Sequence, residues 1–170
     1  VEVYNPTAAT VDLTGWEVGG IGYPFMSGTA IGPGQHLVLV PFHPVEDPLR
    51  VAAFEKAYDV DLAANPSGYL GPYPGRLDNG GERLTLRRAA GDPAAGDPAT
   101  FPLIVEDQVL YDDAAPWPAA ANGSGVSLQR LGVDLWAGDA GNWIDGTPNP
   151  GQMQQIKTIA LEDTASAMER

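Results

Sequence analysis

Glycine and proline interrupt this chain at short intervals, and they limit the folds that it can adopt. Of its 170 residues, 21 are Gly and 16 are Pro. The apolar stretches between these residues are short, and most of them alternate with polar residues, which is the period of a β-strand. Many short strands joined by turns bury their apolar faces best as a sandwich of antiparallel sheets. We therefore expect an all-β domain.

The predicted strands begin at the first residue. Val1 and Val3 alternate with polar neighbours, so the pattern of a strand is already running where the sequence starts. Residues 36–40 are almost entirely apolar, which predicts a strand covered on both faces. A further strand is expected to carry a bulge or bend at Gly15. The remaining predicted strands are residues 11–18, 83–87, 104–111 and 126–131.

One segment has the period of a helix. Asp47 can cap its first turn, and Pro48 suits the first helical position. The spacing predicts a short helix near residues 48–58 whose buried face is formed by Leu49, Ala52, Ala53, Lys56 and Ala57.

The composition changes after residue 151. Residues 152–170 contain no Gly and no Pro, so we assign residues 1–151 to one domain and residues 152–170 to a tail or linker. Residues 156–161 have the β-branched and apolar content of a strand. We expect them to fill an open sheet edge beside Val1, either in the same molecule or by exchange with a second copy. A helical linker is the alternative.

Composition and charge exclude several classes of protein. Because cysteine is absent, the chain has no disulfide, no thiolate metal site and no cysteine nucleophile. The formal net charge of -13 opposes binding to nucleic acid, whose phosphates require a basic surface. No apolar run approaches the length of about 18 residues that a membrane-spanning helix needs, so we expect no membrane insertion.

The sequence offers few catalytic groups. Ser127 follows the first glycine of a G-x-S-x-G motif, but the second glycine is missing. The only histidines, His36 and His43, flank one apolar strand, where a structural role is the simpler interpretation. A zinc site would need both of them and a carboxylate to converge, and no H-E-x-x-H helix is present. We predict that the chain is not an enzyme and has no catalytic, cofactor or metal residues.

Oxygen-rich loops leave calcium as an open alternative. Asp112 and Asp113 share one loop, and Asp139, Asn142 and Asp145 share another. Their spacing is not that of an EF-hand, and loop carboxylates of this kind also serve as ordinary solvated or turn-forming groups.

Two other pairs of carboxylates are adjacent in the sequence. Asp59 with Asp61 and Glu106 with Asp107 could act on a glycoside only if two carboxylates faced each other across a cleft. Proximity in sequence does not predict that arrangement.

Four tryptophans are candidates for the core or for a binding surface. Trp16 lies among alternating apolar residues and is expected in the core. Trp117 and Trp143 are also expected to fill the interior. Trp136 lies in a loop rich in Gly and Asp, so it is the tryptophan that we expect to be exposed.

A series of motifs resembles the lamin tail domain family in its bacterial form. The resemblance covers residues 1–151 and depends on seven short segments in the right order. Two features differ from the family pattern: no strand precedes Val1, and the loop at residues 89–102 is longer than usual. The segments are VEVYNP, LTGW, GPGQHLVLV, GRLDNGGERLTL, YDDAAPWP, GSGVSLQR, and NW followed by TPNPG.

The resemblance implies a fold and a type of function. It implies an immunoglobulin-like antiparallel β-sandwich with one short inserted helix near residues 48–58. It also implies a non-catalytic interaction or structural module within a larger bacterial surface or secreted protein. We expect a protein partner to bind an exposed sheet edge or the loops. The alternative function is a carbohydrate-binding accessory module of an attached hydrolase.

Overall fold

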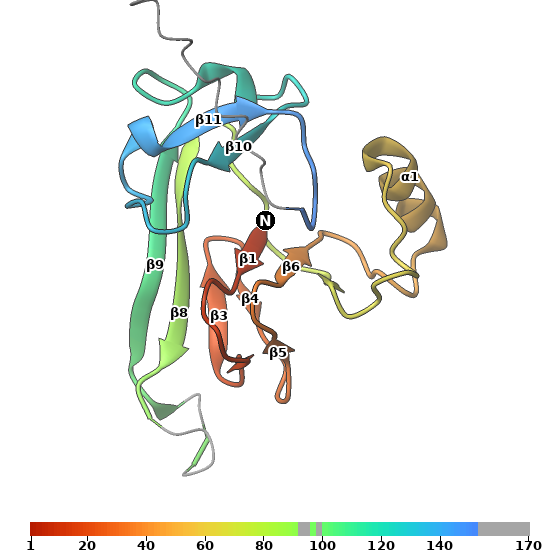
Figure 1. Cartoon of the computed structure of the whole chain (residues 1–170), viewed down its shortest axis with the longest axis vertical. Coiled ribbons are helices and arrows are strands. Elements are labelled where there is room, and N and C mark those ends of the chain that lie inside the picture. The colour runs from red at the N-terminus through yellow and green to blue at the C-terminus, as the bar shows by residue number, and fades with distance from the viewer. Residues whose placement is uncertain (92–95, 98–99, 153–170) are drawn as a thin grey trace, which may run out of the picture.

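The fold consists of short strands in several sheets with one α-helix among the described residues (Figure 1). The computed structural model describes residues 1–91, 96–97 and 100–152. The expectation of an all-β fold with an inserted helix is confirmed. One sheet has the order β1 (Glu2–Tyr4), β6 (His36–Leu39) and β7 (Tyr69–Leu70), and the larger sheet has the order β4 (Tyr23–Pro24), β3 (Trp16–Gly19), β8 (Gly81–Ala89) and β9 (Leu103–Asp112).

Two further strand pairs complete the architecture. The first joins β2 (Val11–Asp12) to β5 (Ala30–Ile31), and the second joins β10 (Ser127–Arg130) to β11 (Trp143–Gly146). The β10–β11 pair lies near one end of the long β8–β9 hairpin (Figure 1). No helix in the described part of the chain is long and apolar enough to cross a membrane.

The two larger sheets share one hydrophobic core, which makes them the layers of a sandwich. Val3, Leu37 and Leu39 enter this core from the first sheet, and Val18 and Tyr23 enter it from the second. Leu84 and Leu86 of β8 pack against the same cluster from its margin. The alternation that predicted β1 and β8 therefore also places their apolar side chains at this core, and β6 is covered on both faces as expected, because Val38 enters a second cluster.

The helix α1 (Pro48–Tyr58) has the expected bounds and the expected cap. The backbone N–H of Arg50 donates to Asp47 at 3.2 Å. The prediction of which face is buried is wrong, because the side chain of Leu49 is 84% exposed. Val51 and Phe54 instead pack against a second apolar cluster that includes Phe42 and Tyr69. Aromatic contacts thus decide which face of this weakly amphipathic helix is turned inward.

Two local expectations also need correction. Gly15 lies in a turn rather than in a bulged strand: its φ is +76°, and the N–H of Trp16 donates to the carbonyl of Leu13 at 2.9 Å. This turn separates β2 from β3. In the first sheet, β6 and β7 pair in parallel. The connection between them contains α1, and a crossover of that length allows two strands to run in the same direction.

Within the described residues, the edge strands are β1 and β7 in the first sheet and β4 and β9 in the larger sheet. Gly151 lies near Glu2 of β1 and close to Val38 and Tyr69, so the chain crosses one face of the first sheet shortly before the described residues end. The predicted edge strand at residues 156–161 lies outside the described residues.

Two leucines provide a direct test of the core. Leu39 is 1% exposed at the end of β6, whereas Leu49 lies on the open face of α1. We expect Leu39→Ala to lower the free energy of unfolding by about 2–5 kcal/mol, because it leaves a cavity. Leu49→Ala should change it by less than about 0.5 kcal/mol. Urea denaturation of both variants measures the difference, and equal effects would contradict this description of the core.

Candidate interaction surface

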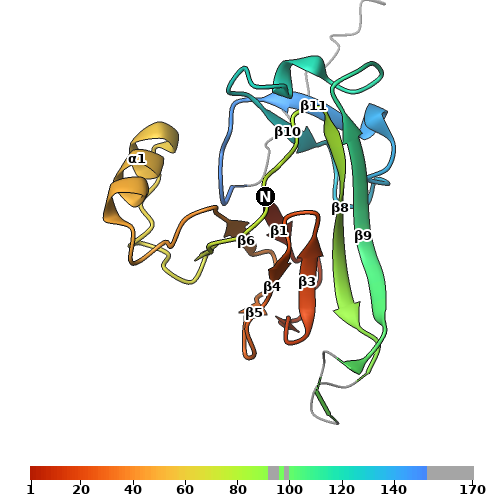
Figure 2. The same ribbon diagram turned by 180° about the vertical axis from the view of Figure 1, so that it is seen from behind.

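The strand β9 is the longest strand of the fold as described and one of the most exposed. It pairs with β8 along its whole length, from Asp112 opposite Gly81 to Leu103 opposite Ala89. Eight of its ten residues are exposed. Val105 is 49% exposed and Leu110 is 54% exposed, so apolar side chains contact solvent near both ends of the strand. Figures 1 and 2 show β9 along the side of the molecule opposite α1.

A bulge divides β9 into two segments. The register shifts between Leu86 and Arg87, so that Asp107 lies opposite Leu86 and Val105 lies opposite Arg87, with Glu106 as the extra residue. Such bulges bend a strand and interrupt its pairing. The extra carboxylate is neutralised, because Glu106 accepts a hydrogen bond from the guanidinium of Arg88.

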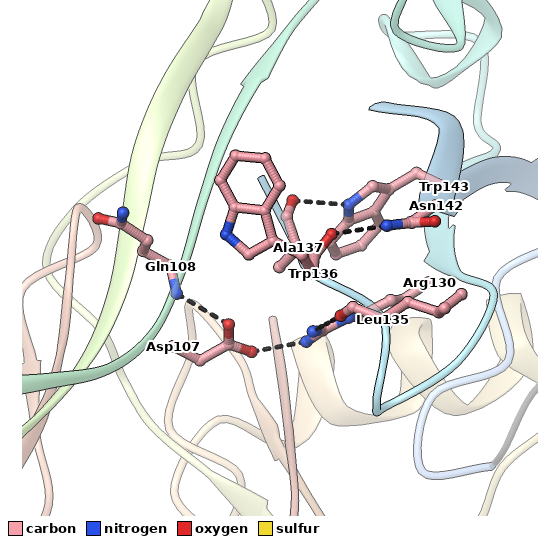
Figure 3. Close-up of polar contacts among 8 residues, drawn as sticks. All are labelled: Asp107, Gln108, Arg130, Leu135, Trp136, Ala137, Asn142 and Trp143. Carbon is pink, nitrogen blue, oxygen red and sulfur yellow. Dashed lines mark hydrogen bonds and ion pairs between the residues drawn. The ribbon is translucent and has the colours of Figure 1, made fainter. Parts of the chain in front are cut away.

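Asp107 joins β9 to the β10–β11 region. One of its oxygens lies 2.6 Å from Nη1 of Arg130, which belongs to β10. Its other oxygen accepts the backbone N–H of Gln108 at 2.9 Å. Nη2 of Arg130 donates to the carbonyl of Leu135 (Figure 3). One arginine therefore ties the loop after β10 to the sheet edge.

This loop displays Trp136. The side chain of Trp136 is 68% exposed, while the neighbouring Ala137 is 2% exposed. The carbonyl of Trp136 accepts a hydrogen bond from Nδ2 of Asn142 at 2.9 Å, and that of Ala137 accepts one from Nε1 of Trp143 at 2.9 Å (Figure 3). The loop is held by its backbone, so the indole of Trp136 is presented on a fixed support.

The β10–β11 pair below this loop has a polar interior. Gln129 is buried, and its Nε2 donates to the carbonyl of Thr147 at 2.7 Å and to Oδ1 of Asn149 at 3.0 Å. Buried amides that are bonded in this way fix the position of the segments that they join. Gln129 therefore holds the chain after β11 against β10.

A tyrosine fixes the end of the hairpin at which β8 begins and β9 ends, near the β10–β11 pair (Figure 1). The hydroxyl of Tyr111 lies 2.8 Å from the carbonyl of Asp78 and 2.9 Å from Oε1 of Glu82. Burial, followed by the hydrogen bond to Glu82, raises the pKa of Tyr111 above its ordinary value. The same Glu82 oxygen accepts the N–H of Asp78 at 3.0 Å. This cluster fixes the turn that leads into β8.

The candidate nucleophile and one candidate base are engaged in structural bonds. Oγ of Ser127 lies 3.3 Å from the carbonyl of Gly146, to which it donates a hydrogen bond, and it accepts a hydrogen bond from Nε2 of Gln129. Nδ1 of His43 accepts the backbone N–H groups of Val45 and Glu46, at 3.3 and 3.0 Å. These contacts belong to a strand pair and to a turn.

His36 is the second histidine, and it lies in a different environment. Its ring packs on Tyr4 with the centroids 4.6 Å apart, and its Nδ1 lies 3.4 Å from Oε2 of Glu2. Burial raises the pKa of Glu2, while His36 and the bond from Gly151 act in the opposite direction. The pair stabilises the junction of β1 and β6.

Three of the candidate calcium ligands accept hydrogen bonds from groups within nine residues of them in the sequence. Asp112 accepts the N–H of Ala114, and Asp113 accepts Nδ2 of Asn122. Asp139 accepts the N–H of Gly141 at 2.9 Å, and Asn142 is bonded to the Trp136 loop, while Asp145 lies on β11. In residues 1–91, 96–97 and 100–152, no three His, Cys, Asp or Glu side chains are grouped so that they could hold a metal ion.

The predicted carboxylate pairs have separate partners as well. Asp61 accepts the N–H groups of Ala63 and Ala64, and Asp59 ends α1 with a φ of +53°. Glu106 forms an ion pair with Arg88, and Asp107 forms one with Arg130.

The tryptophans are distributed partly as expected. Trp16 is half-buried and packs against the main core, and Trp136 is exposed. Trp117 and Trp143 contact each other with their centroids 6.1 Å apart and their planes tilted by 47°. Both are half-buried. They do not form a flat platform with Trp136.

The comparisons with known proteins add no relative. No family model matches the chain, and neither a curated protein nor a solved structure gives a significant match. The resemblance to lamin tail domains therefore stays a prediction, and function has to be argued from the geometry described above.

Sequence reasoning missed the residues that build this surface. Arg88, Arg130 and Tyr111 were not singled out, although they fix the bulge, the loop and the turn. A signal was available for Arg88, because an arginine next to a strand and a carboxylate on the following strand can pair across a hairpin. The contact of Arg130 depends on tertiary structure and has no local signal.

The Tyr111 cluster predicts a dependence of stability on pH. We expect Tyr111→Phe to lower the free energy of unfolding by about 1 kcal/mol at pH 7. Because the folded pKa of Tyr111 is raised, the stability that its hydroxyl contributes is present below the unfolded pKa of about 10 and is lost as the pH rises above it. Urea denaturation between pH 8 and pH 11 should show the difference between the two proteins shrinking. A constant difference would contradict the assignment.

Proposed function

We propose that this chain is a non-catalytic interaction module and that its binding surface consists of β9 and the Trp136 loop. The observation that carries the proposal is the exposed edge strand, which has apolar side chains near both ends and a fixed tryptophan beside its middle. An edge strand presents unpaired backbone groups to which an extended segment of a partner can add.

The distribution of exposed apolar residues supports this location. Eleven large hydrophobic residues are exposed in the described part of the chain, and six of them belong to β9 or to the Trp136 loop. Clusters of this kind mark binding surfaces more often than scattered single residues do. The six are Leu103, Ile104, Val105, Leu110, Val133 and Trp136.

A non-catalytic role is supported by the contacts of the candidate catalytic groups. Ser127 is bonded within the β10–β11 pair, and His43 caps a turn. A nucleophile needs a base within hydrogen-bond reach, and these two side chains have other partners.

The context of the module is also part of the proposal. The motifs that resemble lamin tail domains favour an immunoglobulin-like arrangement and a place in a larger bacterial protein that is secreted or displayed on the cell surface. Binding of proteins by a sheet edge needs no cofactor, and the net charge of -13 disfavours nucleic acid as the partner.

Carbohydrate binding is the second candidate, and the exposed indole of Trp136 favours it. Sugar rings stack on exposed aromatic faces, so an accessory module of a hydrolase would use this residue. A platform usually needs a second ring in the same plane, whereas Trp117 and Trp143 are tilted and half-buried. Binding on a glycan array that is lost in Trp136→Ala would favour this candidate over the first.

Selection from a random peptide library tests the proposed surface. We expect peptides selected on the wild-type chain to bind Trp136→Ala at least about tenfold more weakly, because central aromatic residues dominate such interfaces. The substitution should change the free energy of unfolding by less than about 1 kcal/mol, since the side chain is exposed. Leu49→Ala is the control on the opposite side of the molecule. Peptides that bind all three proteins equally would contradict the proposal.

The tail gives a further proposal, which concerns the edge at β1. We propose that residues 156–161, which lie outside the described residues, add a strand beside β1, either in the same molecule or by exchange with a second copy. Gly151 lies near Glu2 of β1, and this supports the proposal because the chain is still close to that strand where the described residues end. We expect deletion of residues 152–170 to lower the melting temperature or to change the oligomeric state, as determined from the mass in solution. A truncated protein with the same stability and the same oligomeric state would contradict the proposal.

A further inference from the structure

We infer that the segment bound by β9 is an extended, basic peptide from another protein. This inference rests on the proposed function and adds the chemistry of the partner to it. It follows from the charge of the edge strand and its neighbouring loop, considered together with the exposed apolar side chains.

The strand β9 and its neighbouring loop carry an excess of carboxylates. β9 and residues 131–142 contain five carboxylates and no Lys or Arg. Arginines from β8 and β10 neutralise two of these, Glu106 and Asp107. The other three, Asp112, Asp134 and Asp139, are exposed and form no ion pair within the described part of the chain. An incoming strand therefore meets unneutralised negative charge at the end of β9 and on both sides of Trp136.

Charge decides between a second copy and a different partner. Two copies that joined through β9 would bring the same carboxylates together, and each chain has a net charge of -13. Like charges across an interface oppose association, and high net charge keeps proteins apart. A segment that carries Lys or Arg gains attraction from the same field. The edge is thus disfavoured for self-association and suited to a basic strand.

The tryptophan matches this chemistry. An exposed indole is the best aromatic acceptor for a cation, and it also offers apolar area to the stem of a Lys or Arg side chain. Arg130 holds the loop beside Asp107, so Trp136 is presented next to the middle of β9. A strand with alternating basic and apolar residues can direct its apolar side chains toward Val105 and Leu110 and a cation toward Trp136.

Three labelled peptides test the inference. The first alternates Lys and Val over ten residues, the second has Glu in place of Lys, and the third keeps every Lys but has Pro in place of Val. We expect fluorescence anisotropy to show binding of the first peptide and of neither of the others. The affinity for the first peptide should fall at least about fivefold when the salt concentration is raised from 50 to 300 mM. If the proline peptide bound as tightly as the Lys–Val peptide, charge attraction alone would explain binding, and the proposed strand pairing would be wrong.

Two leucine variants locate the site. Leu110→Lys and Leu49→Lys change the net charge equally, but the second lies on α1 at the opposite side of the molecule. We expect Leu110→Lys to bind the Lys–Val peptide at least about fivefold more weakly than Leu49→Lys. Equal affinities would overturn the assignment to β9. Both residues are exposed, so circular dichroism should show both variants folded.

The outcomes separate this inference from the function on which it rests. If library peptides depend on Trp136 but contain no excess of Lys or Arg, the surface stands and the basic partner is wrong. If they do not depend on Trp136, the proposed surface itself fails. A dimer in analytical ultracentrifugation that Leu110→Lys abolishes and Leu49→Lys preserves would identify a second copy as the occupant and overturn the inference.

Discussion

The position of β8 between β3 and β9 is the constraint on which the rest of the structure depends. Leu84 and Leu86 on one side of β8 pack against the core that both sheets share, and Arg87 on the other side pairs with Glu17 of β3. A shift of one residue would exchange the two sides, so burial of the leucines fixes the register. Because β8 is fixed, β9 is held at the margin, where its second edge stays open.

Ion pairs explain how an acidic chain keeps this margin ordered. Arg88 pairs with Glu106, the extra residue of the bulge. Arg130 pairs with Asp107 and donates a hydrogen bond to the carbonyl of Leu135. Exposed pairs of this kind contribute little to stability one at a time. Their effect here is positional: they join β8, β9 and the loop after β10, and so keep the Trp136 loop beside the strand.

The sequence was sufficient to predict what depends on local pattern. Alternation located β8 and β9 to within a few residues, and the Asp47 cap located α1. It failed where tertiary contacts decide: Phe54 rather than Leu49 anchors the helix, because an aromatic cluster lies on that side. The exposure of Trp136 was predicted from its Gly and Asp neighbours, but its proximity to Asp107 depends on Arg130, which is distant in sequence from β9.

An exposed edge strand usually brings a risk of aggregation, and two features of β9 limit this risk. The bulge at Glu106 and the bond from Gln108 to Asp107 interrupt pairing at the middle of β9. The net charge keeps identical edges apart. If β9 binds a partner strand as proposed, that strand has to pair on one side of the bulge and gains from carrying the opposite charge. Selectivity would then follow from the charge alone, because like charge disfavours a second copy, whereas the bulge hinders any strand in the same way.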